Sequence, residues 1–138
     1  MIVVDASIAV RWTIDMPLSD AAEALLRGSM PIIAPDLVVA EVANAFVTAV
    51  RQSPAAAQRA RDGLDFLPRW FAELVGLSSL RNDAFKIALE LAHPAYDCFY
   101  LALAEQRGCP VLTTDERLIR KVAGTDHEAR VTHLRDWT

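Results

Sequence analysis

Three observations predict an α/β fold with a parallel sheet for this chain. Short apolar runs recur along the sequence and alternate with longer segments of helical character. Runs of this kind are typical of strands that helices cover on both faces. No internal repeat, linker or low-complexity segment interrupts the 138 residues, so residues 1–138 are expected to form a single domain.

The first boundaries follow from apolar runs and helix-start signals. An apolar Ile-Val-Val run ends at Asp5 and predicts a buried first strand, after which a short helical stretch is expected. Asp20 with Glu23 resembles a capping box and opens the next helix. Asp36 is the expected N-cap of a long helix, which Pro54 terminates.

Proline and glycine set the later boundaries. Pro68 interrupts one helical pattern, Pro94 separates two others, and Gly108 is the expected residue just past the end of the second. The predicted strands are residues 2–4, 31–34, 73–77, 111–113 and 130–134. The predicted helices are residues 7–12, 20–26, 36–51, 55–67, 82–92, 95–107 and 116–122.

Composition argues against a membrane-spanning or secreted protein. Hydrophobic residues make up 53% of the chain, yet no run approaches the roughly 18 apolar residues that cross a bilayer. The first residues include Asp5 and lack the basic start of a signal peptide, so we expect a cytoplasmic protein. Cys98 and Cys109 are expected to be buried free thiols, and the histidines show no metal-binding spacing.

Two acids lie in segments where folding alone does not favour a charge. Glu41 is more than a turn inside an apolar helix that we expect to be buried on most sides. Asn44 and Thr48 share its helix face, and neither can neutralise a carboxylate. Asp97 lies in a similarly apolar segment, although a first-turn acid that interacts with the helix dipole explains it equally well.

Two further acids follow predicted strands. Asp5 comes after the first strand, and Asp115 comes two residues after the strand at residues 111–113. Ligands of open parallel sheets bind beyond the carboxyl ends of the strands, at the point where the strand order reverses. Each of these aspartates could instead be a turn residue that binds its own backbone. Together with Glu41 and Asp97, they could converge on one crevice.

Such a cluster of carboxylates would require cations. Two carboxylates about 5 Å apart repel by roughly 3 kcal/mol at an effective dielectric constant near 20. Hard divalent ions with oxygen ligands relieve this repulsion, and an all-carboxylate site favours Mg²⁺ or Mn²⁺ over Zn²⁺. Bound cations would also make the site attractive to a phosphodiester, so the net charge of −4 does not exclude a nucleic-acid substrate.

Four segments in this order resemble the PIN-domain family, and within it the VapC-type toxins of bacterial toxin–antitoxin pairs. They cover most of the chain's length. The segments are residues 4–7 (VDAS), 41–45 (EVANA), 96–105 (YDCFYLALAE) and 112–118 (LTTDERL). Residues 66–80 fit no clear pattern of the family.

The resemblance implies a Rossmann-like α/β/α sandwich with a central, mostly parallel sheet, and an endoribonuclease that depends on Mg²⁺ or Mn²⁺. It also implies a homodimer, silenced by a cognate antitoxin protein. The family's catalytic and metal-binding acids match Asp5, Glu41, Asp97 and Asp115. Supporting polar positions match Ser7, Asn44 and Thr113.

Other functions remain open on the sequence. A signalling receiver domain of this size would need adjacent acids after the first strand, and a haloacid-dehalogenase phosphatase would need Asp-x-Asp there. Here Ala6 and Ser7 follow Asp5 instead. The stronger alternative is a catalytically silent protein of the same fold that binds RNA or a partner.

Overall fold

The computed structural model describes residues 1–138, and a five-stranded sheet lies at its centre. Every pair of neighbouring strands is parallel, and the strand order is β3-β2-β1-β4-β5. The predicted parallel sheet is therefore confirmed, including the last strand at an edge. The strands are β1 (Ile2–Val4), β2 (Ile32–Pro35), β3 (Glu73–Val75), β4 (Val111–Thr113) and β5 (Val131–His133).

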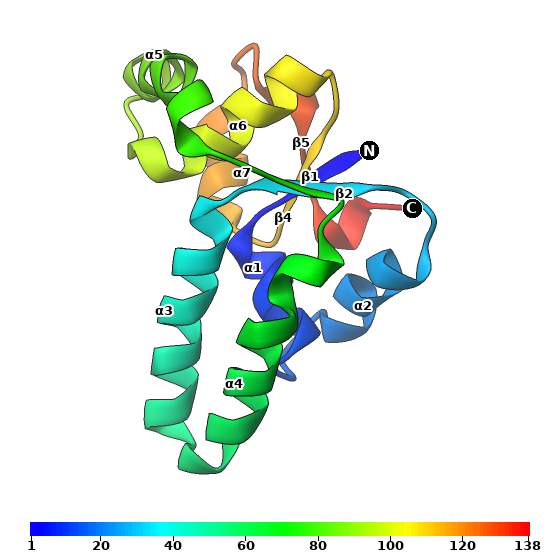
Figure 1. The fold of residues 1–138 in the computed structure, drawn as a ribbon. Coiled ribbons are helices and arrows are strands. Elements are labelled where there is room, and N and C mark those ends of the chain that lie inside the picture. The colour runs from blue at the N-terminus through cyan, green and yellow to red at the C-terminus, as the bar shows by residue number, and fades with distance from the viewer.

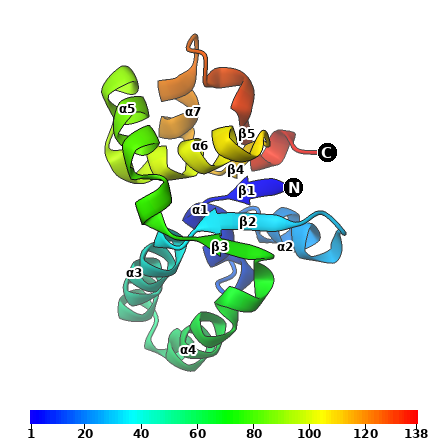
Figure 2. The same ribbon diagram turned by 45° about the horizontal axis from the view of Figure 1, so that its top comes forward.

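Helices cover both faces of the sheet and complete the predicted three layers. Helices α5, α6 and α7 lie on one face, and α1 to α4 lie on the other (Figures 1 and 2). None of the helices combines the length and the apolar character needed to cross a bilayer. The helices are α1 (Ala6–Ala9), α2 (Ser19–Arg27), α3 (Leu37–Gln52), α4 (Ala57–Phe66), α5 (Arg81–Leu91), α6 (Ala95–Arg107) and α7 (Glu116–Val122).

Helix α6 is enclosed by the core along most of its length. Cys98, Tyr100 and the four residues from Leu101 to Ala104 are all at most 1% exposed. Burial of each leucine side chain contributes about 1.5–3 kcal/mol to folding. The packing of α6 therefore fixes where its first turn, and with it Asp97, lies relative to the sheet.

Helix α3 is less buried than its apolar sequence predicts. It forms an antiparallel pair with α4, and the pair extends away from the sheet (Figure 1). Only Val38, Val42 and Phe46 of α3 are buried, at a spacing of one helical turn, and Val47 is 47% exposed. The expectation of burial on most sides is wrong, because only one face of α3 is turned toward the rest of the molecule.

Two predicted helix ends can be compared with the structure. The capping box of Asp20 and Glu23 is wrong, because α2 begins one residue earlier and neither side chain caps it. Instead, the Ser19 hydroxyl accepts a hydrogen bond of 3.0 Å from the backbone N–H of Met16. Gly108 ends α6 with φ of 63°, as predicted, since glycine adopts this left-handed conformation without a steric penalty.

The segment without a recognisable pattern, residues 66–80, contains little regular structure. It holds a 3-10 turn at Leu67–Trp70, the edge strand β3, and a second 3-10 turn at Leu77–Ser79. Strand β3 is only partly buried, which explains its weak apolar signal.

Candidate active site

The candidate site lies where β1 and β4 end side by side. These strands are neighbours at the centre of the sheet, and the strand order reverses between them. Asp5 follows β1 directly, and Asp115 follows β4 after one intervening residue. The sequence placed both acids at a topological switch point, and the structure has them there.

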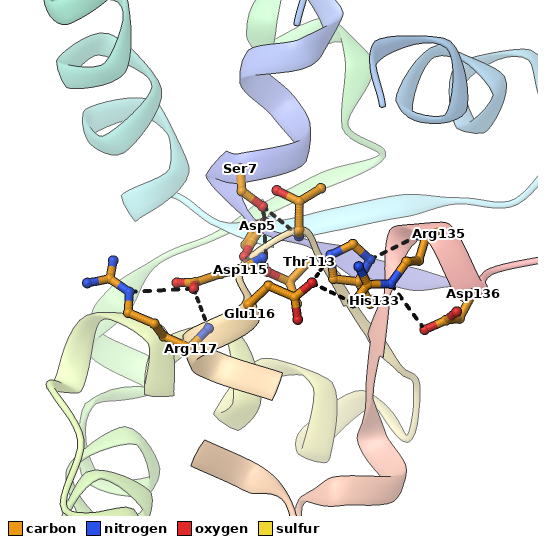
Figure 3. A network of polar contacts seen from close by, with 10 residues as sticks. Asp5, Ser7, Thr113, Asp115, Glu116, Arg117, His133, Arg135 and Asp136 are labelled. Atoms are coloured by element: carbon orange, nitrogen blue, oxygen red, sulfur yellow. Dashed lines mark hydrogen bonds and ion pairs between the residues drawn. The ribbon is translucent and has the colours of Figure 1, made fainter. Parts of the chain in front are cut away.

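Asp5 is nearly buried and is held by two hydroxyl groups. It is 6% exposed, and its carboxylate accepts hydrogen bonds of 2.5 Å from the hydroxyls of Ser7 and Thr113. These hydroxyls accept in turn from the backbone N–H groups of Thr114 and Asp115, at 2.9 Å each. Figure 3 shows this chain of donors at the strand ends. The hydroxyls of Ser7 and Thr113 thus orient the carboxylate of Asp5, and the backbone of the β4–α7 connection holds these two hydroxyls in place.

Burial raises the pKa of Asp5 to about 6. The hydrogen bonds from Ser7 and Thr113 oppose this rise in pKa, and the negative charge of Asp97 adds to it. The Arg11 guanidinium interacts with the charge of Asp5, but it does not offset the effect of burial on the pKa of Asp5. Asp5 is therefore a buried carboxylate whose negative charge is only partly compensated.

Glu41 receives a hydrogen bond from a residue of another helix. The hydroxyl of Tyr100 in α6 donates to Oε1 of Glu41 in α3 at 2.5 Å. Burial raises the pKa of Glu41, against the effect of this hydrogen bond, and the charge of Asp97 raises it further. Tyr100 itself is only 1% exposed, and burial followed by the charge of Glu41 raises its pKa, so it stays a neutral donor.

Asp97 lies in the first turn of α6, where the helix dipole favours a negative charge. Its Oδ2 is 2.6 Å from Nε2 of His93, which lies just before the helix. This is a short polar contact between residues four apart in sequence. Asp97 is therefore a first-turn acid, as its local sequence allowed. This position is compatible with a role in the site.

Asp115 is the N-cap of α7. Its Oδ1 accepts from the backbone N–H of Arg117 at 2.8 Å and lies 3.7 Å from Nε of the same arginine. Figure 3 shows its carboxylate directed toward Arg117. The turn role that the sequence left open for a strand-end aspartate is thus present at Asp115.

Asp5, Glu41 and Asp97 share one electrostatic environment. The charge of Asp97 raises the pKa of both Asp5 and Glu41, and all three raise the pKa of Tyr100. Even so, no group of three or more Asp, Glu, His or Cys side chains is arranged to hold a metal ion in this structure. The metal-binding quartet therefore stays a prediction.

The chemistry of the donors fits a hard divalent cation. All the groups are carboxylates, and the buried one has an elevated pKa that a cation would lower. Protein donors occupy one oxygen each of Glu41, Asp97 and Asp115. The second oxygen of each of these carboxylates accepts no hydrogen bond from the protein and is free to bind an ion.

Sequence reasoning missed Tyr100 and His93. The signal for His93 was its spacing of four residues from Asp97. No local signal points to Tyr100, because its partner Glu41 is 59 residues away. Asn44, predicted as a supporting residue, is exposed in α3 one turn after Glu41. The predicted free thiols are confirmed, since Cys98 and Cys109 are buried and unpaired.

Comparisons with known proteins agree with this architecture. Residues 2–124 match the PIN domain family. The chain is 31% identical over 122 residues to ribonuclease VapC3 of Pyrobaculum aerophilum, covering 87% of this chain and 93% of that protein. The crystal structure of PAE2754 from the same organism superposes with a TM-score of 0.69 at 21% identity, over 97% of this chain and 89% of that one. The family match argues against the alternative of a signalling receiver domain. The chain belongs to the PIN-domain family.

Proposed function

We propose that this protein is an endoribonuclease that uses Mg²⁺ or Mn²⁺ to hydrolyse RNA phosphodiester bonds. The observation that supports it best is the cluster of Asp5, Glu41 and Asp97 at the switch point, where burial and the charge of Asp97 raise the pKa of both Asp5 and Glu41. Acids that serve only the fold are usually paired or exposed. The name of the similar protein, ribonuclease VapC3, supports the same activity.

In this proposal Asp5, Glu41, Asp97 and Asp115 hold the metal ion or ions. A divalent ion held there would lower the pKa of a water molecule and so would help to supply the nucleophile for hydrolysis near neutral pH. The chain's own residues hold the ligands in place. Ser7 and Thr113 orient Asp5, Tyr100 orients Glu41, and His93 orients Asp97.

The proposal extends to the biological role. We propose that the protein is the toxin of a toxin–antitoxin pair, acts in the cytoplasm, forms a homodimer and is silenced by a cognate antitoxin. The similarity to a VapC protein supports this role. A short neighbouring gene for a DNA-binding protein, whose co-expression abolishes toxicity, is the expected genetic signature.

The activity is tested with purified protein, free of any antitoxin, and a structured RNA. We expect cleavage with Mg²⁺ or Mn²⁺, products with a 5′-phosphate and a 3′-hydroxyl, and no cleavage in EDTA. Sequencing the 5′ ends of the fragments gives the cleavage sites. RNA that stays intact with every divalent ion would favour the alternative of a silent binding protein.

The matched control uses an acid outside the site. Glu73 is an exposed glutamate in β3 that pairs with Arg107, so Glu73→Gln is expected to cleave as the wild type does. Asp5→Asn is expected to be inactive. Equal cleavage by Asp5→Asn and wild type would contradict the proposed site.

A further inference from the structure

A pocket of about 480 Å³ adjoins the acid cluster, where α1, α3 and the start of α6 meet. Six of its nine lining residues are hydrophobic, and they form the walls. Ser7 and Glu41, which belong to the candidate active site, also line this pocket. A ligand in the pocket would therefore lie directly beside the proposed metal ligands.

Tyr96 lines this pocket and is open to solvent. Its side chain belongs to a residue that is 65% exposed, at the start of α6 and next to Asp97. It is one of the exposed large hydrophobic side chains of the molecule, and its hydroxyl makes no hydrogen bond to the protein. The fold therefore gains little from this aromatic ring, while an exposed ring beside a pocket is a suitable stacking surface.

Asn44 supplies a polar group on the same pocket. Its side-chain amide is exposed and has no hydrogen-bond partner in the protein. A side-chain amide offers both a donor and an acceptor, which is the combination that pairs with the edge of a nucleobase. The pocket thus combines apolar walls, one free aromatic ring and one free amide.

Electrostatics gives a reason for such a pocket. The chain has a net charge of −4, and the site itself is acidic. Attraction between basic side chains and phosphates, the usual source of affinity for nucleic acids, is weak here. Contacts with the bases are then needed to hold a strand at the site.

We propose that this pocket binds one unstacked base of single-stranded RNA, with Tyr96 stacking on the base and Asn44 pairing with its edge. The nucleotide is the one adjacent to the bond that is cut. This inference rests on the proposed ribonuclease function, because it takes the strand to pass over the neighbouring acids. It predicts a preference for particular bases at one position of the substrate.

The test measures binding without cleavage. Short single-stranded RNAs carry 2-aminopurine at each position in turn and are titrated with the Asp5→Asn protein in Mg²⁺. We expect the fluorescence to change most at one position, where the base enters the pocket. Tyr96→Ala should weaken binding roughly tenfold and remove that change, because one base–aromatic stack is lost. Tyr96→Phe should restore both, since it keeps the ring.

Phe85 provides the matched control. It is a similarly exposed aromatic residue, 63% exposed, and lies in α5 outside the pocket. Phe85→Ala should bind RNA as the parent protein does, which shows that loss of any exposed ring is not the cause. Asn44→Ala should change which base is preferred at the responsive position more than it changes the overall affinity.

The outcomes separate this inference from the proposed activity. Unchanged fluorescence at every position, or tight binding by Tyr96→Ala, overturns the base pocket even if the wild type cleaves RNA. A position-specific signal with a wild type that cleaves no RNA keeps the pocket and rejects the nuclease. If Tyr96→Ala also dissociates a dimer in light scattering, the surface is a protein interface and the inference is wrong.

Discussion

The two ends of α6 lie beside acids whose electrostatic surroundings are opposite. At its start, Asp97 joins Asp5 and Glu41, and the pKa values of Asp5 and Glu41 are raised by burial and by the charge of Asp97. At its end, Arg107 pairs with Glu73 through two hydrogen bonds of 2.7 and 2.9 Å, which lowers the pKa of that glutamate. The same helix thus connects a cluster of acids with raised pKa values to an exposed ion pair.

Several acids near the end of α6 have partners. Asp83 accepts from Gln106 at 2.9 Å, and Glu90 lies 3.2 Å from His127 and 3.9 Å from Lys86. These residues line a polar cleft of about 510 Å³. Acidic residues by themselves therefore do not mark the active site of this protein. The distinguishing property is a carboxylate that the protein partly or fully buries and whose pKa is thereby raised.

The largest expected effect comes from removing the buried charge. Asp5→Asn should lower RNA cleavage at least about 100-fold, because a metal ligand is lost. The same change should stabilise the metal-free protein by up to about 3 kcal/mol at pH 7.5, since a rise in pKa from 3.8 to about 6 reflects the unfavourable burial of the charge. Urea unfolding in EDTA measures this stability.

The pH dependence of this stabilisation has a defined sign. The folded protein binds the Asp5 proton more tightly than the unfolded chain does, so the wild type loses stability as pH rises from about 4 to about 6. The stability difference between Asp5→Asn and wild type should open over that interval and stay constant above it. A difference that is the same at pH 3 and at pH 7 would show that burial of the charge is not its source.

Binding of a divalent metal ion should stabilise the folded protein, because the ion offsets the negative charge of the acid cluster. Saturating Mn²⁺, at about 100 times its dissociation constant, should stabilise the wild type by about 2.7 kcal/mol and raise its Tm by on the order of 10 °C. Differential scanning fluorimetry checks this. Asp5→Asn should show a much smaller shift, and Glu73→Gln should respond as the wild type does. An equal shift in all three proteins would place the ion elsewhere.

A smaller effect is expected from the residue that orients Glu41. Tyr100→Phe keeps the buried ring and removes the hydroxyl that donates to Glu41 at 2.5 Å. Hydrogen bonds to charged groups contribute about 1.5–3 kcal/mol, and partners of metal ligands typically change metal affinity 10- to 100-fold. The Mn²⁺ concentration for half-maximal cleavage should rise by that factor, with the maximal rate changed less. A fall in the maximal rate alone would argue against an orienting role.

The smallest effect is expected at the paired end of α6. Glu73→Gln breaks an exposed ion pair, and such pairs contribute little because water already solvates both charges. Cleavage and the urea midpoint should both stay close to the wild-type values. A large loss of cleavage in Glu73→Gln would mean that acids at both ends of α6 contribute to activity, and that a raised pKa does not distinguish the catalytic acids.

The α/β class, the five strands, the parallel sheet and the placement of Asp5 and Asp115 at strand ends could all be predicted from the sequence. These features are local, because apolar runs, prolines and Gly108 act on their own neighbourhood. Glu41 lies in a helix that is less buried than its apolar residues suggested. Helix α3 buries only one face, so its apolar sequence did not report burial on most sides.

The partner of each acid, in contrast, depends on how distant segments pack in the folded protein. The hydrogen bond between Tyr100 and Glu41 joins α6 to α3, and the one between Thr113 and Asp5 joins β4 to β1 across 108 residues of chain. The same holds for the pairing of Glu73 with Arg107. No periodicity encodes these contacts, because they depend on how separate elements pack. The pKa of a carboxylate depends on its neighbours in space. The candidate acids could therefore be identified from the sequence, but the charges and hydrogen bonds around each of them could not.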